Sequence, residues 1–211
     1  MDRDTIRGKL NRYTALAFSF LPALDHPRVL DIGCGTGVPT IHLAELSNGH
    51  ITGIDSDANA IAMLQKKIRQ QHLEKQVVAQ VCSFNCLPFL PESFNLVWSE
   101  GVIAFKGFRA GLYAWGGLVK KGGFLVIHDE IRDLPRKVEM VHDSPFTLSG
   151  YFVLYENIWE RDYCRPLREL LANEPDYGNT EDGKRATEEM ELFRTDPESF
   201  RSVFYIIRKG D

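Results

Sequence analysis

The chain has 211 residues, of which 44% are hydrophobic and 26% are charged, and its formal net charge is −4. This composition is typical of a globular domain large enough to bury a core. The negative charge and the lack of a basic stripe in the sequence argue against a nucleic-acid partner and against an anionic membrane surface.

The N-terminal residues do not have the order of a signal peptide. Residues 1–10 are charged, and the apolar run over residues 15–21 is short and stops at Pro22. A run of this length cannot cross a membrane. We therefore expect a cytoplasmic protein.

The four cysteines do not form a metal-binding pattern. Cys34 and Cys164 stand alone, and Cys82 and Cys86 have neither a second cysteine pair nor clustered histidines near them. Zinc sites need four ligands at characteristic spacings. The sequence therefore predicts no metal site and free thiols in a reducing compartment.

Residues 4–21 predict an amphipathic helix, with Ile6, Leu10, Tyr13 and Phe20 recurring at helical spacing. Two roles fit this N-terminal segment, residues 1–27. It packs on the core, or it forms a lid over a ligand, with Tyr13 or Thr14 near that ligand.

Strands alternate with helices over the next hundred residues. The expected strands are 28–32, 50–55, 77–82, 94–99 and 124–128, and the expected helices are 39–47, 58–71 and 108–119. Such alternation predicts a parallel sheet with right-handed crossovers. The pattern is looser after His128, where we expect helices 135–142, 159–172 and 185–193 and strands 147–154 and 202–208. No repeat or linker divides the chain, which predicts a single domain over residues 1–211.

Residues 29–37 run from an apolar strand into three glycines, Gly33, Gly35 and Gly37, just before a helix. Glycines let the backbone approach a ligand, and a helix N-terminus attracts an anion. The spacing is G-x-G-x-G, because Val38 occupies the third glycine position of the dinucleotide pattern. A glycine triplet alone also fits a tight turn without a ligand.

Asp55 ends the next predicted strand, about 20 residues beyond the glycine turn, where nucleotide-binding α/β folds hold a ribose diol. Its two carboxylate oxygens can accept from two hydroxyls, and its charge would repel the 2′-phosphate of NADP. Taken alone, Asp55 also suits the N-cap of the following helix, and the two roles are compatible.

Residues 29–37 resemble motif I of the class I S-adenosylmethionine (SAM)-dependent methyltransferases. Residues 98–103 with Gly107 and Phe108, residues 120–124 and residues 156–159 resemble a small-molecule subgroup near the ubiquinone and menaquinone biosynthesis enzymes. The likeness extends, with gaps, from about Thr14 to the last strand. Family members usually have Tyr-Asn where this chain has Ala104 and Phe105, and they have a longer segment in place of residues 129–144. The identity of the methyl acceptor therefore does not follow from that of the relatives.

The resemblance implies a Rossmann-like three-layer α/β/α sandwich, with a mostly parallel seven-stranded sheet and one antiparallel strand near the C-terminus. It divides the single domain into a helical lid (1–27), a cofactor-binding core (28–130) and an acceptor-side segment with terminal strands (131–211). It also implies a cofactor site. The residues implied are Asp31, Gly33, Cys34, Gly35, Thr36 and Gly37 for the methionine part, Asp55 for the ribose, Ser83, Phe84 and Asn85 for the adenine, and Ser56, Ser99 and Glu100 beside them. Phe84 either stacks on the adenine or fills the core.

Methyl transfer from SAM is an in-line displacement that needs geometry and a dry pocket more than a base. Glu100 is the first candidate for a base, although a role in holding the α-amino group of SAM is preferred. His128, at the end of the fifth predicted strand, is the second candidate, although a structural role is preferred. His142, Tyr151, Trp159 and Tyr163 fit an acceptor pocket or the core equally well.

The sequence therefore predicts a SAM-dependent methyltransferase that acts on a small molecule, releases S-adenosylhomocysteine (SAH), and is a monomer or homodimer. Three alternatives stay open. The chain binds SAM or SAH without turnover, it is an NAD-dependent oxidoreductase, or its acceptor is a macromolecule. The glycine spacing disfavours the second, and the negative charge and the lack of an added recognition domain disfavour the third.

Overall fold

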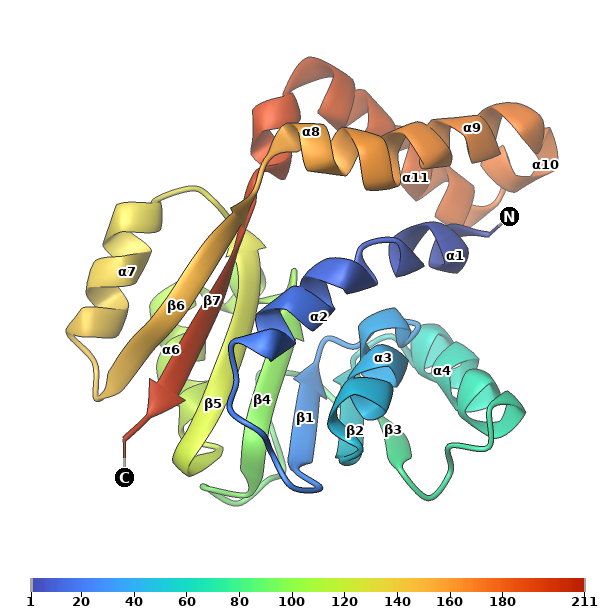
Figure 1. Cartoon of the computed structure of the whole chain (residues 1–211). Coiled ribbons are helices and arrows are strands. Elements are labelled where there is room, and N and C mark those ends of the chain that lie inside the picture. The colour runs from blue at the N-terminus through green and yellow to red at the C-terminus, as the bar shows by residue number, and fades with distance from the viewer. Residues whose placement is uncertain (1, 211) are drawn as a thin grey trace.

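The computed structural model describes residues 2–210, so the two ends of the predicted domain, Met1 and Asp211, lie outside the described residues. Seven strands form one sheet in the order β3-β2-β1-β4-β5-β7-β6, with helices on both faces (Figure 1). The strands are β1 (Arg28–Ile32), β2 (His50–Asp55), β3 (Val77–Val81), β4 (Phe94–Glu100), β5 (Val119–Glu130), β6 (Phe146–Leu154) and β7 (Ser202–Lys209).

Neighbouring strands from β3 to β5 pair in parallel, and β7 is antiparallel to both β5 and β6. Strand β6 therefore runs in the same direction as β5, and β7 is the one strand that runs against the others. The predicted Rossmann-like sandwich with a mostly parallel sheet is confirmed.

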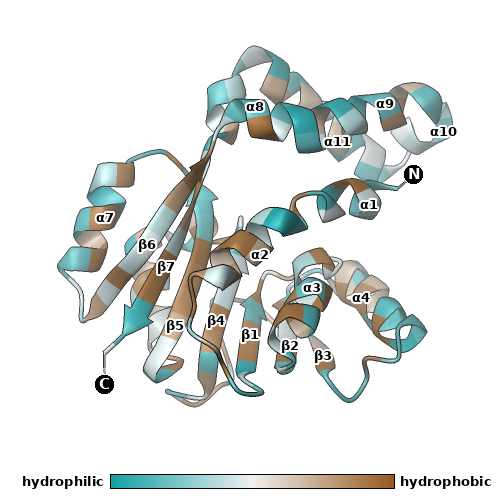
Figure 2. Cartoon of the chain, viewed as in Figure 1, coloured by the Kyte–Doolittle hydropathy of each residue, from teal (hydrophilic) through white to brown (hydrophobic). Residues whose placement is uncertain are grey.

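The central strands are apolar because they are covered on both faces, as parallel strands must be. Within β4, Phe94, Leu96, Val97 and Trp98 are all buried. Figure 2 shows hydrophobic colour along the central strands. Successive side chains point to opposite faces, so Leu96 and Trp98 join one core cluster and Val97 joins the other. Phe94 lies with Val97 because the register shifts between Phe94 and Leu96.

Each face of the sheet has its own helices. One face packs against α2 (Asn11–Ser19), α3 (Val38–Ser47) and α4 (Ala58–Gln70). The other packs against α5 (Ile103–Lys106), α6 (Phe108–Gly116) and α7 (Leu134–His142).

A third cluster of helices lies beyond the carboxyl ends of the parallel strands (Figure 1). It contains α1 (Arg3–Gly8), α8 (Glu156–Trp159), a π-helical turn (Glu160–Cys164), α9 (Arg165–Asn173), α10 (Pro175–Gly178), α11 (Glu181–Thr195) and a 3₁₀ turn (Pro197–Phe200). Its buried side chains, among them Ile6, Tyr163 and Met190, form a separate small core.

The predicted helix 4–21 is wrong as a single element. It is two helices, α1 and α2, which meet after Gly8. Glycine is a poor helix residue, and the connecting amides of Leu10 and Tyr13 donate to carbonyls three residues back rather than four.

Several other boundaries also differ. The predicted helix 108–119 ends at Gly116, and the fifth strand begins at Val119 instead of residue 124, with a register shift opposite Phe94 and Leu96. The predicted helix 185–193 begins at Glu181 because the hydroxyl of Thr180 caps it by accepting from the Gly183 amide. Periodicity alone does not show such caps. Within the described part of the chain, no helix is both long enough and apolar enough to cross a membrane.

Candidate functional site

The glycine turn links β1 to α3 and has positive φ at Gly33, Gly35 and Gly37 (+75°, +52° and +85°). The amides of Gly33 and Cys34 both donate to the carbonyl of Ile54 on β2, at 2.8 and 3.0 Å. The turn is therefore fixed to the end of the neighbouring strand.

The three glycines are needed for different reasons. A Cβ on Gly33 would lie 2.0 Å from Val102 Cγ2, and one on Gly37 would lie 2.2 Å from Leu64 Cδ1. A Cβ on Gly35 would meet nothing within 4 Å. Gly33 and Gly37 therefore allow close packing, whereas Gly35 borders open space.

Helix α3 begins directly after this turn, with Gly37 as its N-cap and no side-chain hydrogen bond at the cap. The N–H groups of Val38 and Thr40 are therefore available to an anion, since Pro39 between them has none, and the positive end of the helix dipole adds to their effect.

A groove of about 490 Å³ lies over the glycine turn. It lies between α1, the start of α4 and the C-terminal helices α10 and α11. Six of the predicted cofactor residues line it: Asp31, Gly33, Cys34, Gly35, Thr36 and Glu100. The other lining residues include Asp57, Asn59, Met63, Tyr177 and Asp182.

The other predicted cofactor residues are not among those that line the groove. Gly37 packs below it, and the buried Ser99 hydroxyl donates to the carbonyl of Ile32 at 3.2 Å. Ser56 is exposed. In the loop after β3, Ser83 Oγ accepts from the Asn85 amide, Asn85 Oδ1 accepts from Lys106 at 3.5 Å, and Phe84 packs against the core.

Asp55 holds the turn through both carboxylate oxygens. Oδ2 accepts from the Gly35 amide and Oδ1 accepts from the Asp57 amide, each at 2.9 Å. A ribose diol would therefore share these oxygens with two backbone donors. Asp57 is the residue that caps α4, by accepting from the amides of Asn59 and Ala60.

Asp31 is a buried acid below the glycine turn. Its Oδ2 accepts from Thr40 Oγ1 at 2.6 Å, and burial raises the pKa of this carboxyl to about 7. Burial also raises the pKa of the neighbouring Cys34 thiol, which favours its unreactive protonated form.

Glu100 ends β4 on the same edge of the sheet. Its Oε1 accepts from Thr14 Oγ1 at 2.8 Å and from Trp98 Nε1 at 2.9 Å, and burial raises its pKa. The first of these bonds ties helix α2 to the sheet, so Thr14 contacts a predicted site residue.

His128 lies beside Glu100 in the β4–β5 ladder. Its ring stacks on Phe204 at 4.2 Å and faces Trp159 at 6.1 Å, and its Nε2 is 2.8 Å from Ser202 Oγ. The same hydroxyl accepts from Trp159 Nε1 at 3.1 Å. Burial lowers the pKa of His128 to about 3, so the ring is neutral near pH 7.

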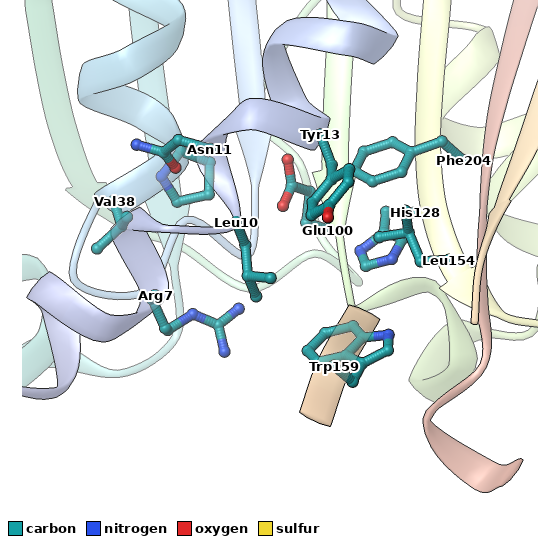
Figure 3. Close-up of a pocket in the computed structure, with 11 residues that line it drawn as sticks. Arg7, Leu10, Asn11, Tyr13, Val38, Glu100, His128, Leu154, Trp159 and Phe204 are labelled. Carbon is teal, nitrogen blue, oxygen red and sulfur yellow. The ribbon is translucent and has the colours of Figure 1, made fainter. Parts of the chain in front are cut away.

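A small cavity of about 20 Å³ lies between these side chains (Figure 3). It is lined by Arg7, Leu10, Asn11, Tyr13, Val38, Pro39, Glu100, His128, Leu154, Trp159 and Phe204. Four of them, Arg7, Val38, Pro39 and Glu100, also line the groove. We call these four residues the seam, because the groove and the cavity meet there.

Helix α1 is attached at both sides of the groove. Asp4 accepts from Thr36 Oγ1 at 2.6 Å and from Lys67 Nζ at 2.5 Å. On the other side, Arg3 donates to Asp182 and to Glu189, each at 2.6 Å. The helix therefore spans from the glycine turn to α11.

The sequence did not indicate several of these lining residues. Arg7 and Asn11 read as ordinary polar positions of an amphipathic helix, and Tyr177 and Asp182 lie in a segment that shows only charge. Of the four possible acceptor-pocket residues, Trp159 lines the cavity, whereas Tyr163 is buried beside it and both Tyr151 and His142 are exposed.

We expect acid pH to destabilise the protein through His128. The unfolded chain takes up this proton near pH 6.5, but the folded protein resists it until about pH 3. Between these values the unfolded state holds more protons, so stability falls as pH falls. Between pH 6.5 and 4, the unfolding free energy of wild type should therefore fall by about 3 kcal/mol more than that of His128→Phe, as measured by urea denaturation.

Asp31→Asn is the matched control, because its effect has the opposite sign. The folded protein protonates Asp31 below about pH 7, but an unfolded aspartate does so only near 3.8. Lowering the pH across this window therefore adds stability to wild type and not to the variant. Equal pH slopes in wild type and His128→Phe would contradict the assignment of a buried neutral imidazole.

Residues 29–123 match the protein family described as "Methyltransferase domain". "Uncharacterized methyltransferase YodH" of Bacillus subtilis (strain 168) is 31% identical over 105 residues, which are 50% of this chain and 43% of that protein. This chain spans about half, or less, of the length of the curated relatives that it matches, with 56%, 26% and 37% covered in three of them.

Two solved structures share the fold over nearly the whole chain. A SAM-dependent methyltransferase from Thiobacillus denitrificans, in complex with SAH, has a TM-score of 0.72 and 14% identity, covering 95% of this chain and 91% of that one. The [4+2]-cyclase SpnF has a TM-score of 0.76 and 18% identity, covering 95% and 81%. At such identities the likeness shows the fold alone.

Proposed function

We propose, from the premise that residues 29–123 carry a methyltransferase domain, that this chain transfers the methyl group of SAM to a small-molecule acceptor. The observation that carries the proposal is the seam. The groove and a second, smaller cavity share four lining residues, Arg7, Val38, Pro39 and Glu100. Two adjoining pockets suit a reaction in which a donor bound in the groove transfers a group to an acceptor bound in the cavity.

The residues of the groove fit SAM. Gly35 leaves open space against the turn, and the free amides of α3 suit the methionine carboxylate. Asp31 and Glu100 line the groove with acidic side chains, which suit the positive sulfonium and α-amino groups of SAM. The volume of about 490 Å³ is within the range of ligand pockets.

When bound, SAM supplies an activated methyl group. The chain's own contribution is to orient the two molecules and exclude water, since the His128 Nε2 is already bonded to Ser202 and the Tyr13 hydroxyl to Asp162. The bond to Ser202 supports the structural role for His128. The position of Glu100 on the groove supports its cofactor role. We further propose the division into lid (1–27), cofactor core (28–130) and acceptor side (131–211), with α1 as the part of the lid that spans the groove.

Calorimetric titration with SAH, SAM and NAD tests the cofactor. We expect micromolar binding of SAH and SAM, about −8 kcal/mol, and none of NAD. Binding of NAD instead of SAH would contradict the proposed function and favour the alternative of an NAD-dependent oxidoreductase.

The size of the cavity favours one second candidate, a protein that binds SAM or SAH without turnover. A volume of about 20 Å³ holds about one water molecule, so an acceptor needs the cavity to enlarge. A structure of the SAH complex separates the two. A widened cavity beside the sulfur supports the enzyme, and a filled one supports the binding protein.

We expect Asp55→Ala to weaken SAH binding by about tenfold to hundredfold, because a carboxylate hydrogen bond to a ribose contributes about 1.5 to 3 kcal/mol. Adenosine, which has the ribose but not the methionine, should lose affinity by the same factor. Calorimetry on both ligands checks this, with the exposed Ser56→Ala as control. Unchanged SAH affinity would rule out the ribose role, and a loss for SAH alone would indicate that Asp55 acts only by shaping the turn at Gly35.

A further inference from the structure

Arg7 is a charged residue shared by the groove and the cavity. It lies in the last turn of α1 and lines both the groove and the cavity. Figure 3 shows its guanidinium beside the side chain of Leu10. Among the four residues of the seam, Glu100 and Arg7 are the charged ones, and their charges are opposite.

The neighbouring arginines differ from Arg7 in having carboxylate partners. Arg3 pairs with Asp182 and Glu189, and Arg12 and Arg161 both pair with Asp162. Within residues 2–210, the Arg7 guanidinium has a ring contact but no hydrogen bond or ion pair. Of the two half-buried arginines on α1, Arg3 is thus neutralised, whereas the donors of Arg7 stay available; Arg185, which also lines the groove, is exposed.

The contact of Arg7 connects its charge to the aromatic side chains next to the cavity. The guanidinium carbon lies 5.8 Å from the ring centroid of Tyr163, and the Tyr163 ring meets Trp159 edge-on at 5.9 Å. Trp159 in turn lines the cavity and faces His128. Arg7 therefore belongs with the aromatic wall of the cavity, whereas the α3 amides that suit the methionine carboxylate lie at the glycine turn.

The rest of the cavity wall is mainly apolar. Leu10, Leu154, Trp159 and Phe204 surround the neutral imidazole of His128. A guanidinium offers five donors in a planar fork that matches a carboxylate. A ligand that suits this wall has an apolar or aromatic body and one anionic end.

We propose that Arg7 binds the carboxylate of the methyl acceptor, and that the acceptor is a small organic acid with an apolar body. This inference rests on the proposed function. An anionic acceptor would also be attracted by the positive charges at the seam, whereas a cationic acceptor would be repelled by both Arg7 and the sulfonium of SAM. Arg7 is therefore a specificity-determining residue.

Calorimetry on the SAH-saturated chain tests the assignment with matched acid and amide probes, phenylacetate against phenylacetamide and hexanoate against hexanamide. The cost of enlarging the cavity is common to both members of a pair. We expect at least one acid to bind about tenfold or more tighter than its amide. Arg7→Gln should abolish this preference and Arg7→Lys should keep part of it. The control is Arg109→Gln, which removes the charge of an exposed residue on α6.

The SAH titration separates the possible failures. If wild type does not bind SAH, the proposed function fails. If it binds SAH but no acid is preferred over its amide, only the role of Arg7 fails. If Arg7→Gln weakens SAH and leaves 5′-methylthioadenosine unchanged, the carboxylate on Arg7 is that of the methionine, and the acceptor assignment is overturned.

Discussion

Gly35→Ala is expected to reduce SAH affinity by on the order of a hundredfold, or about 3 kcal/mol, while the chain stays folded. Gly35 lines the groove with a φ of +52°, and a Cβ at this position would have no atom within 4 Å. The new methyl group would therefore stand in the space for the ligand. The backbone strain of an alanine there costs about 1 to 2 kcal/mol. Calorimetry and thermal unfolding of the same sample measure the two effects separately.

Gly33→Ala is the contrasting variant, because its Cβ would lie 2.0 Å from Val102 Cγ2. Overpacking and a φ of +75° together should lower stability by about 2 to 4 kcal/mol. A Gly35→Ala protein that binds SAH like wild type would show that the ligand does not approach this turn.

Glu100→Gln is expected to weaken SAM binding by about tenfold to hundredfold and SAH binding by less. The two ligands differ in the positive charge on sulfur, and the Glu100 carboxylate lies at the seam with Oε1 oriented by Thr14 and Trp98. Removing a partly buried charge opposite a cation costs about 1.5 to 3 kcal/mol. The measurement is the ratio of the SAM and SAH dissociation constants in wild type and variant.

Glu45→Gln serves as the control, since Glu45 is an exposed acid on α3. The stability of Glu100→Gln should change little, because the lost charge was desolvated and its pKa was raised by burial. An unchanged SAM-to-SAH ratio would place the sulfonium away from Glu100.

The core of the fold could be predicted because its sequence signals are local. The strand β1, the turn at Gly33 to Gly37 and the strand β2 each follow from short runs of apolar residues and glycines. The break after Gly8 and the early start of β5 at Val119 depend on tertiary contacts, including the pairing of Val119 with Phe94. Hydrophobic periodicity is a local signal and carries no information on such contacts.

The candidate site divides in the same way. Asp31, Gly35 and Glu100 lie at strand ends of a parallel sheet, where position in the sequence fixes position at the ligand edge. Arg7 and Tyr177 come from helices far apart in the chain that meet over the groove. Their placement depends on contacts such as the pairs of Arg3 with Asp182 and Glu189, which carry no sequence signature.

The position of β7 has a consequence for the order in which the chain acquires its structure during synthesis. Strand β6 is made about fifty residues before β7, yet its only partner in the described sheet is β7, which also pairs with β5. During synthesis, one edge of β5 has no strand paired to it, and β6 has no strand to pair with, until Ser202–Lys209 leave the ribosome. His128 likewise gains its contacts with Phe204 and Ser202 only then. The wall of the small cavity is thus completed by β7, long after the residues of the glycine turn have been made.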